Sequence, residues 1–290
     1  MDPEVRPLFE AATRPYIGVS RHTWHFARGK LRHDPVFFSL LRRGLLPDRG
    51  SLLDLGCGQG ILLSLLKAAK EQYQAGVWPR DWPAPPSNLG LRGIELRADR
   101  VQAARRALGD SVQVDQRDLR DLDLRPCSVI IMLDVLLYLA AEEQQRLLGK
   151  AAAALEAGGM LLMREADAGA GFAFRVTKWS ERIAGALRGE FGQRLHYRSA
   201  VQWIAELVAR GFAVSTEPMS GGTPFANVLF VAKKSPTPQL KPQMNTDNLW
   251  LNSDRATARH QPLFHRELPG RRVAGDHRRH ARQALGTGAL

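Results

Sequence analysis

The 290-residue chain is 44% hydrophobic and 24% charged, with 26 Gly and 17 Pro, an ordinary globular composition that excludes a fibrous or wholly disordered protein. No apolar run is nearly as long as the roughly 18 residues needed to cross a bilayer. The start MDPEVRPLFE lacks the basic and apolar stretches of a signal peptide. We therefore expect a cytoplasmic protein without a membrane span. Two cysteines, Cys57 and Cys127, are too few for a disulfide scaffold or a cysteine-rich zinc site, so we expect no metal.

Basic residues outnumber acidic ones, 41 against 29, which gives a net charge of +12. Residues 235–290 contain nine basic and four acidic residues, a net of +5. Clustered cations attract phosphate-rich partners, but here they form no stripe and have no interleaved aromatic residues. A small-molecule partner is the first expectation, and nucleic acid is the alternative.

The predicted elements follow a simple order. Residues 1–50 indicate one or more helices, interrupted at Pro35 and ended near Gly44 and Pro47. From residue 51 onward, short apolar segments alternate with amphipathic ones. They predict five strands, with helices after the first, the second and the fourth, and Gly158 is placed to end the helix before the fifth strand. The five strands are predicted at 51–55, 91–95, 112–114, 128–133 and 160–163.

The second half of the chain has a different pattern. Residues 167–234 predict two helical stretches followed by two strands, at 212–216 and 227–232, which are close enough in sequence to pair antiparallel. Ser199 and Gln202 form a capping box at the start of the second helix. Residues 235–290 lack sustained periodicity, so we expect a disordered basic tail.

These elements predict an α/β fold: a doubly wound, mostly parallel seven-stranded sheet, with a C-terminal antiparallel strand pair and an N-terminal helical segment. We divide the chain into a helical lid at 1–50, a main domain at 51–234 with an insertion loop at about 73–90, and the tail. Ligands of such sheets bind at the carboxyl ends of the strands, and every motif described below falls at such an end.

The strongest motif is LDLGCGQG at 53–60, directly after the first strand and before a helix. Its glycines allow a tight turn and close approach of a ligand, and the following helix offers unpaired N–H groups. The dinucleotide-binding pattern would need a small residue where this chain has Ile61. Asp54 would repel a pyrophosphate but could accept a hydrogen bond from an ammonium group.

This motif resembles that of the class I S-adenosylmethionine-dependent methyltransferases, an acid followed by G-x-G-x-G. GIEL at 93–96 is similar to the second-strand end whose acid accepts the ribose hydroxyls, and DL at 118–119 is similar to the segment that contacts adenine. Asp134 resembles the residue that flanks the methyl-donating sulfonium. The resemblance therefore implies S-adenosylmethionine as cofactor, with the contacts Asp54, Gly56, Cys57, Gly58, Gly60, Glu95, Leu96, Asp118, Leu119 and Asp134.

Some of these acids also have a purely structural interpretation. Asp54 could cap its loop, Glu95 could favour the dipole of the following helix, and Asp118 could belong to a solvated charge cluster. The long stretch between Gly60 and Glu95 departs from the family pattern. So does Leu137, which stands where some relatives have a histidine.

The resemblance implies methyl transfer by in-line displacement, to a small-molecule acceptor of phenolic, aryl or polyketide-like type. Asp134 and Tyr138 are the expected catalytic residues, and His22 or His25 could also serve as the base. The expected acceptor contacts are Tyr16, Trp24, Arg28 and Arg164. The segments WHFARGKLRHDPVF and PFANVLFVA resemble, weakly, methyltransferases associated with bacterial aryl-polyene pigment synthesis.

Three alternatives remain at this point. An RNA methyltransferase would explain the charge, although the chain lacks an N-P-P-[YF] motif. A nicotinamide-dependent dehydrogenase shares the architecture but not the glycine spacing, and a non-catalytic partner could retain the cofactor fold. The sequence indicates neither the oligomeric state nor a role for the tail.

Overall fold

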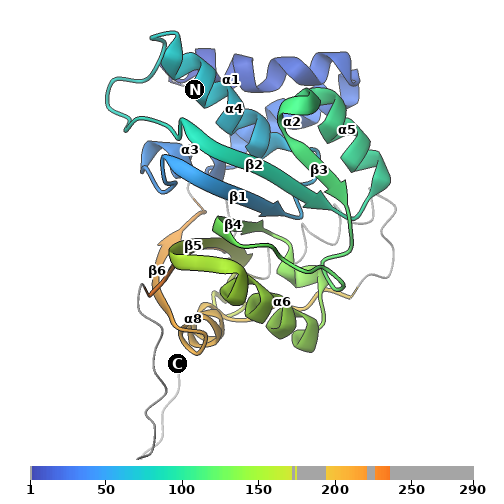
Figure 1. Ribbon diagram of the computed structural model, residues 1–290, viewed down its shortest axis with the longest axis vertical. Helices are drawn as coiled ribbons and strands as arrows, with labels where there is room; N and C mark the ends of the chain where they lie inside the picture. The colour runs from blue at the N-terminus through green and yellow to red at the C-terminus, as the bar shows by residue number, and fades with distance from the viewer. Residues whose placement is uncertain (1, 172–173, 175–193, 221–225, 236–290) are drawn as a thin grey trace, which may run out of the picture. The chain divides into compact units, whose positions relative to one another are not determined.

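The structure, a computed structural model, describes residues 2–171, 174, 194–220 and 226–235. Its strands are β1 (Arg49–Leu55), β2 (Asn88–Glu95), β3 (Gln113–Gln116), β4 (Cys127–Leu133), β5 (Leu155–Ala166), β6 (Phe212–Pro218) and β7 (Asn227–Lys234). They form one seven-stranded sheet in the order β3-β2-β1-β4-β5-β7-β6 (Figure 1). Neighbours among β1 to β5 are parallel, and β7 is antiparallel to both β5 and β6. The predicted fold class is confirmed.

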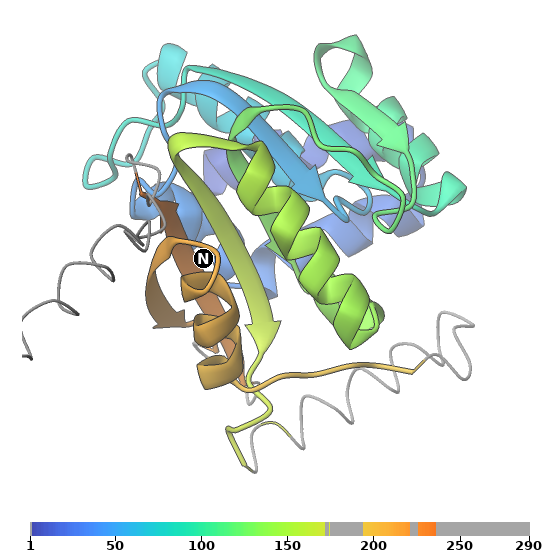
Figure 2. The same cartoon turned by 60° about the horizontal axis from the view of Figure 1, so that its bottom comes forward.

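Two layers of helices cover the sheet (Figure 2). One face packs against α1 (Arg6–Thr13), α2 (Arg21–His33), α3 (Val36–Arg42), α4 (Ile61–Gln74) and α5 (Ala98–Leu108). The other face packs against α6 (Ala141–Ala154) and α8 (Ala200–Val208). Three short 3-10 helices, η1 (Arg14–Gly18), η2 (Gly109–Ser111) and η3 (Leu136–Tyr138), complete the described helical elements.

The two buried clusters follow the alternation of side chains along the strands. In β4, Val129 and Ile131 point to the first cluster, whereas Ile130 and Met132 point to the second. All four are fully buried. A strand buried on both faces is expected to be a continuous apolar run, which is why this segment was recognisable from sequence.

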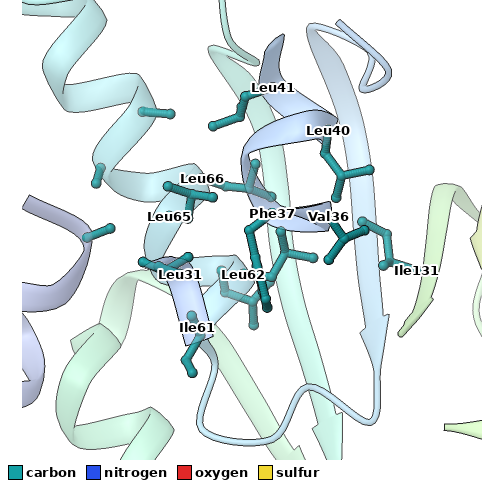
Figure 3. Packing of buried hydrophobic residues seen from close by; sticks show 14 of the residues in the cluster. Leu31, Val36, Phe37, Leu40, Leu41, Ile61, Leu62, Leu65, Leu66 and Ile131 are labelled. Atoms are coloured by element: carbon teal, nitrogen blue, oxygen red, sulfur yellow. The ribbon is translucent and has the colours of Figure 1, made fainter. Parts of the chain in front are cut away.

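The N-terminal helices are integrated into the first cluster. Leu31 of α2 and Phe37 of α3 pack with Leu62 and Leu65 of α4 and with Ile131 of β4 (Figure 3). Ser20 caps α2 by accepting a hydrogen bond from Thr23 N at 3.0 Å. The predicted N-terminal helical segment is therefore present, and its role as a lid stays a prediction.

The connection between α4 and β2 is shorter than the predicted insertion, because α4 continues to Gln74 and β2 already begins at Asn88. The segment folds back on the protein instead of looping out. The Trp78 and Trp82 rings lie 5.7 Å apart edge to face, and Trp82 also lies 6.2 Å from Phe38 of α3. Trp78 donates a hydrogen bond to Pro83 O at 3.0 Å.

One predicted boundary is wrong: Gly158 does not end α6. The helix ends at Ala154, and Leu155 already begins β5 by pairing with Cys127 of β4. The register shifts between Cys127 and Val129, and Gly158 adopts a φ of +76° in this irregular stretch. The glycine accommodates a β-bulge. Glycine is favoured both in bulges and at helix ends because it tolerates positive φ.

The C-terminal elements follow the prediction where the structure describes them. Ser199 and Gln202 form the expected capping box at the start of α8, and β6 and β7 pair antiparallel. The first predicted helix of 167–234 and the tail at 236–290 fall on residues outside the described ranges. Among the described helices, none has both the length and the apolar character that a membrane span requires.

Candidate functional site

The loop at 56–60 joins the carboxyl end of β1 to α4 and is fixed to the neighbouring strand. The amides of Gly56 and Cys57 donate to Ile94 O of β2, at 2.8 and 3.0 Å. Tyr16 of η1 also contacts the loop, and its buried hydroxyl donates to Gln59 O at 2.9 Å. The glycine loop is therefore held by main-chain contacts from β2 and a side-chain contact from η1.

The three glycines of this loop have positive φ but different surroundings. A Cβ on Gly56 would lie 2.1 Å from Val135 Cγ2, and one on Gly60 would lie 2.8 Å from Leu108 Cδ1. Gly56 and Gly60 are thus required by protein packing. A Cβ on Gly58 would meet nothing within 4 Å, so Gly58 has open space beside it that a ligand could use.

Two buried carboxylates flank the loop. Asp54, near the end of β1, and Glu95, at the end of β2, are only 4% and 6% exposed. Glu95 accepts hydrogen bonds from Gly58 N at 3.0 Å and Arg97 N at 2.9 Å, one on each oxygen. Burial and then the negative charge of Glu95 raise the pKa of Asp54 to about 7. A ligand cation would relieve this cost.

Cys57 lies close to both carboxylates. Burial, followed by the charges of Asp54 and Glu95, raises the pKa of its thiol well above the usual range. A Cβ on Gly93 would lie 2.7 Å from Cys57 Sγ, so the glycine of the GIEL segment makes room for this side chain. The surroundings keep Cys57 a neutral packing residue and disfavour a thiolate nucleophile.

The Asp118 segment follows β3 at the same sheet edge. Arg117 N donates to Glu95 O at 3.0 Å, which places the next residue, Asp118, close to the end of β2. The Asp118 carboxylate accepts hydrogen bonds from Arg120, including one from its main-chain amide at 2.9 Å, and these bonds lower its pKa. Leu119 is half-buried, and Leu96 is 53% exposed.

A second charged group lies at the ends of β4 and β5. Arg164, only 1% exposed, donates through Nε to Asp134 Oδ1 at 2.9 Å and through its terminal nitrogens to Asp134 and Asp34. Lys30 pairs with Asp34 at 2.9 Å and lies 4.0 Å from Asp134. Although burial raises the pKa of Asp34, the charges of Arg164 and Lys30 outweigh it and lower this pKa to about 2.

Glu165, the next residue of β5, is a buried carboxyl that accepts from Val135 N at 3.2 Å and Leu136 N at 2.8 Å. Burial and the charge of Asp134 raise its pKa to about 8. Arg164 and Glu165 together hold the turn at 134–136. Because that turn contacts the glycine loop through Val135, the two charged groups of the site are connected.

The expected acceptor residues lie in different surroundings. Tyr16 is fully buried under the glycine loop, and Arg164 is buried between two carboxylates. Arg28 is bound by Glu10 at 2.6 Å, and its guanidinium carbon lies 4.7 and 4.9 Å from the ring centroids of Phe9 and Trp24. Tyr138 ends η3 and is half-buried.

Two features bear on ligands. Gln59 Oε1 is buried and has no hydrogen-bond donor within the described part of the chain, which fits a ligand donor at the glycine loop. Across residues 2–171, 174, 194–220 and 226–235, no group of three or more His, Cys, Asp or Glu side chains could hold a metal ion.

Sequence reasoning did not find Asp34 or the role of Glu165. Asp34 stands four residues after Lys30, a spacing typical of a helical ion pair, and precedes Pro35. The pair Arg164-Glu165 ends an apolar strand, an unusual position for two charges. Both signals were visible, but only the fold brings Asp34 to a residue 130 positions away.

Comparisons with known proteins agree with this geometry. A family model described as a methyltransferase domain matches residues 23–217, more than half of the chain. A carboxy-S-adenosyl-L-methionine synthase from Chromohalobacter salexigens is 27% identical over 132 residues, which is 42% of this chain and 44% of that relative. The chain therefore matches less than half the length of this curated relative.

Two solved structures show the same fold. An O-methyltransferase family protein from Burkholderia thailandensis superposes with a TM-score of 0.50 at 19% identity, covering 72% of this chain and 57% of that chain. A magnesium protoporphyrin IX methyltransferase from Synechocystis PCC 6803, with bound SAH, superposes with a TM-score of 0.50 at 20% identity, covering 81% and 100%. With the family match, these findings show that the chain belongs to the class I S-adenosylmethionine-dependent methyltransferases.

Proposed function

We propose that this chain binds S-adenosylmethionine at the glycine loop and transfers the methyl group to a small-molecule acceptor. The observation that carries the proposal is the pair of buried carboxylates, Asp54 and Glu95, beside open space at Gly58. A buried carboxylate without a cationic partner is costly. An amino-acid ammonium group would supply the cation that Asp54 lacks, and two ribose hydroxyls would add to the main-chain donors of Glu95.

Each contact is assigned by its chemistry. Asp54 would accept from the ammonium group, and its raised pKa is the expected consequence of leaving it without that cation. Each oxygen of Glu95 accepts one main-chain N–H, and a carboxylate oxygen has a second lone pair for a ribose hydroxyl. Asp118 would accept from the adenine amine, and Gln59 Oε1 from a further donor of the ligand.

Held by Asp54, Glu95 and Asp118, the cofactor would supply an electrophilic methyl carbon. Transfer would form a bond from the acceptor atom to that carbon, break the carbon–sulfur bond with its electron pair left on sulfur, and release a proton from the acceptor. The protein holds the acceptor in line and excludes water. Both oxygens of Asp134 accept hydrogen bonds from Arg164, so we propose that Asp134 orients groups at this edge. Tyr138, His22 and His25 remain the proposed bases.

The acceptor is proposed to be a phenolic, aryl or polyketide-like small molecule, with Trp24 and Tyr138 as its ring contacts. Arg28 and Arg164 would act indirectly, because each guanidinium is already bound by carboxylates of this chain. Tyr16 would support the glycine loop from beneath through its bond to Gln59.

The curated relative is named as the synthase of a carboxylated form of S-adenosylmethionine. A carboxylated donor would require a free cation beside its new charge. Arg164 is the buried guanidinium of this edge, and its donors are divided between Asp34 and Asp134. We therefore propose transfer of an ordinary methyl group, and neither formation nor use of a carboxylated donor.

Calorimetric titration with S-adenosylmethionine tests the binding site. Asp54→Asn and Glu95→Gln should each weaken binding by about 1 to 3 kcal/mol, the scale of a lost hydrogen bond to a charged group. The exposed residues Asp81 and Glu71 provide matched controls, since Asp81→Asn and Glu71→Gln should leave affinity unchanged. Absence of heat at millimolar ligand with the wild-type chain would contradict the proposal.

The acceptor class requires a second experiment. The purified chain is incubated with cell extract and methyl-labelled donor, and small molecules, RNA and protein are then separated. Label in the small-molecule fraction is the expected result. Label in RNA, with binding that weakens steeply as salt rises, would favour the RNA methyltransferase alternative. Donor binding without any labelled product would favour a non-catalytic partner.

A further inference from the structure

A chain of charged contacts connects the N-terminal helices to the edge of the sheet. Lys30 and Asp34 lie at the end of α2, Arg164 lies near the end of β5, and Asp134 follows β4. Asp34 accepts from both Lys30 and Arg164, and Arg164 also donates to Asp134. The guanidinium is therefore shared by two carboxylates from segments 100 residues apart in the sequence.

The local sequence explains the position of Asp34. A residue before proline is restricted to extended backbone, and Asp34 has φ −103° and ψ 109°, so α2 ends there. Asp34 Oδ1 also accepts from Val36 N at 3.2 Å, at the start of α3. Val36 and Ile131 belong to the same buried cluster (Figure 3), which fixes this corner over β4.

Asp134 is held in an uncommon conformation. Its φ is +56°, the only positive φ of a non-glycine residue in the described ranges. Such a backbone is strained and persists where surrounding contacts determine it. Arg164 supplies those contacts, because its carbonyl accepts from Asp134 N at 2.9 Å while its guanidinium binds the side chain.

The consequence reaches the glycine loop. The turn at 134–136 is held by Arg164 and Glu165, and the next side chain, Val135, fills the space beside Gly56 that a Cβ would occupy. A displacement of the turn would move Val135 against or away from Gly56. The contacts of Arg164 are therefore linked to the glycine loop through the 134–136 turn and Val135.

From these contacts we infer that Asp34 and Arg164 are positioning residues of the donor site, which act through Asp134 and the 134–136 turn on the glycine loop. The expected effect on donor affinity rests on the proposed function. The expected coupling between Asp34 and the 134–136 turn rests on the structure alone. The α2–α3 corner would thus adjust the donor site without touching the donor.

The experiment compares Asp34→Asn with the wild-type chain. The matched control is Asp48→Asn, which removes a carboxylate that binds Ser87 through both its amide, at 3.1 Å, and its hydroxyl, at 2.6 Å, before β2. Hydrogen exchange of the Asp134, Val135 and Leu136 amides is measured first, because each has an assigned acceptor. We expect Asp34→Asn to accelerate their exchange about tenfold, a common size for coupling between sites, and Asp48→Asn to leave it unchanged.

The second readout is the affinity for S-adenosylmethionine and for S-adenosylhomocysteine. Since the two ligands differ by the charged methyl-bearing sulfonium, a misplaced Asp134 should weaken S-adenosylmethionine more than S-adenosylhomocysteine. A merely structural role of Asp34 would weaken both equally. We expect Asp34→Asn to lower the ratio of the two affinities by at least about threefold, and Asp48→Asn to preserve it.

The outcomes separate the two claims. If the wild-type chain binds neither ligand, the proposed function fails, while the exchange rates still test the coupling. If it binds both and Asp34→Asn behaves as Asp48→Asn does, the inference is overturned and the proposed function stands. Should Asp34→Asn fail to unfold cooperatively, Lys30→Met replaces it, with the same direction expected and unchanged exchange overturning the inference.

Discussion

Two carboxylate groups at the same edge of the sheet differ in how their charge is balanced. At the glycine loop, Asp54 and Glu95 are buried together, and the influences on the pKa of Asp54 both raise it. At the ends of β4 and β5, Asp34 and Asp134 share the buried guanidinium of Arg164. The first group is suited to receive a cationic ligand, whereas the second is balanced by the chain itself and serves the framework.

The largest expected effect is on the balanced group. Arg164→Met removes the buried guanidinium and leaves Lys30 as the remaining cationic neighbour of Asp34 and Asp134, so it should destabilise the fold by about 3 to 5 kcal/mol. Urea unfolding measures this change. Arg125→Met, at an exposed arginine, should be neutral to within about 0.5 kcal/mol. Equal stability of the two variants would show that the Arg164 contacts contribute nothing.

A substitution at the glycine loop should instead raise the free energy of unfolding. The folded-state pKa of Asp54, about 7, lies above the ordinary value of 3.8, so the native state retains its proton between these values and stability falls as pH rises through this window. Asp54→Asn removes that loss and should be more stable than wild type at pH 8, by up to about 4 kcal/mol, while binding S-adenosylmethionine less well. Thermal unfolding at pH 5 and pH 8 tests this, and a variant less stable at pH 8 would contradict it.

Acid should weaken the ion pairs of Asp34 with Arg164 and Lys30 and so lower the stability of the fold. The pKa of Asp34 is lowered to about 2 by Arg164 and Lys30 against the effect of burial, so its contribution is present above the unfolded value near 4 and is lost as pH falls toward 2. The difference between a pKa of 3.8 and one of about 2 corresponds to about 2.5 kcal/mol. Asp34→Asn should therefore have a flatter stability profile between pH 4 and pH 2, measured by urea unfolding. An unchanged slope would refute this assignment.

The smallest expected effect on stability comes from two glycine substitutions, which should differ only in their effect on donor binding. Gly58 and Gly76 have φ of +58° and +72°, and a Cβ would meet nothing within 4 Å at either one. Gly58→Ala and Gly76→Ala should each cost about 1 kcal/mol for the left-handed backbone. Only Gly58→Ala should also weaken S-adenosylmethionine binding, because only that methyl group would enter the proposed donor site. Equal affinities would place the donor elsewhere.

Much of the fold could be predicted from sequence because the signals are local. The continuous apolar run of β4 and the capping box of α8 report burial and helix termini directly. The boundary at Gly158 could not be predicted, because the choice between helix terminus and bulge depends on pairing of Leu155 with Cys127. The same is true of the 75–87 segment, whose aromatic residues pack on a helix from the N-terminal region.

The candidate site was predictable where a motif contains it. The acid and glycines of 54–60 and the acid of 93–96 follow consecutive parallel strands, and such ends meet at one edge. The network of Arg164 was not predictable, since it joins Asp34 to Asp134 through tertiary structure alone. Arg164 was expected to meet an acceptor, and only the structure places two carboxylates around its guanidinium.

The central claim is that the Asp54–Glu95 group receives the cation of S-adenosylmethionine. Titration calorimetry at pH 6, repeated in buffers of different ionisation enthalpy, measures the protons released on binding. Since a cation beside Asp54 would lower its pKa from about 7, the account predicts binding with release of close to one proton by the wild-type chain and of none by Asp54→Asn. Binding without proton release from the wild-type chain, or no binding at all, would contradict it.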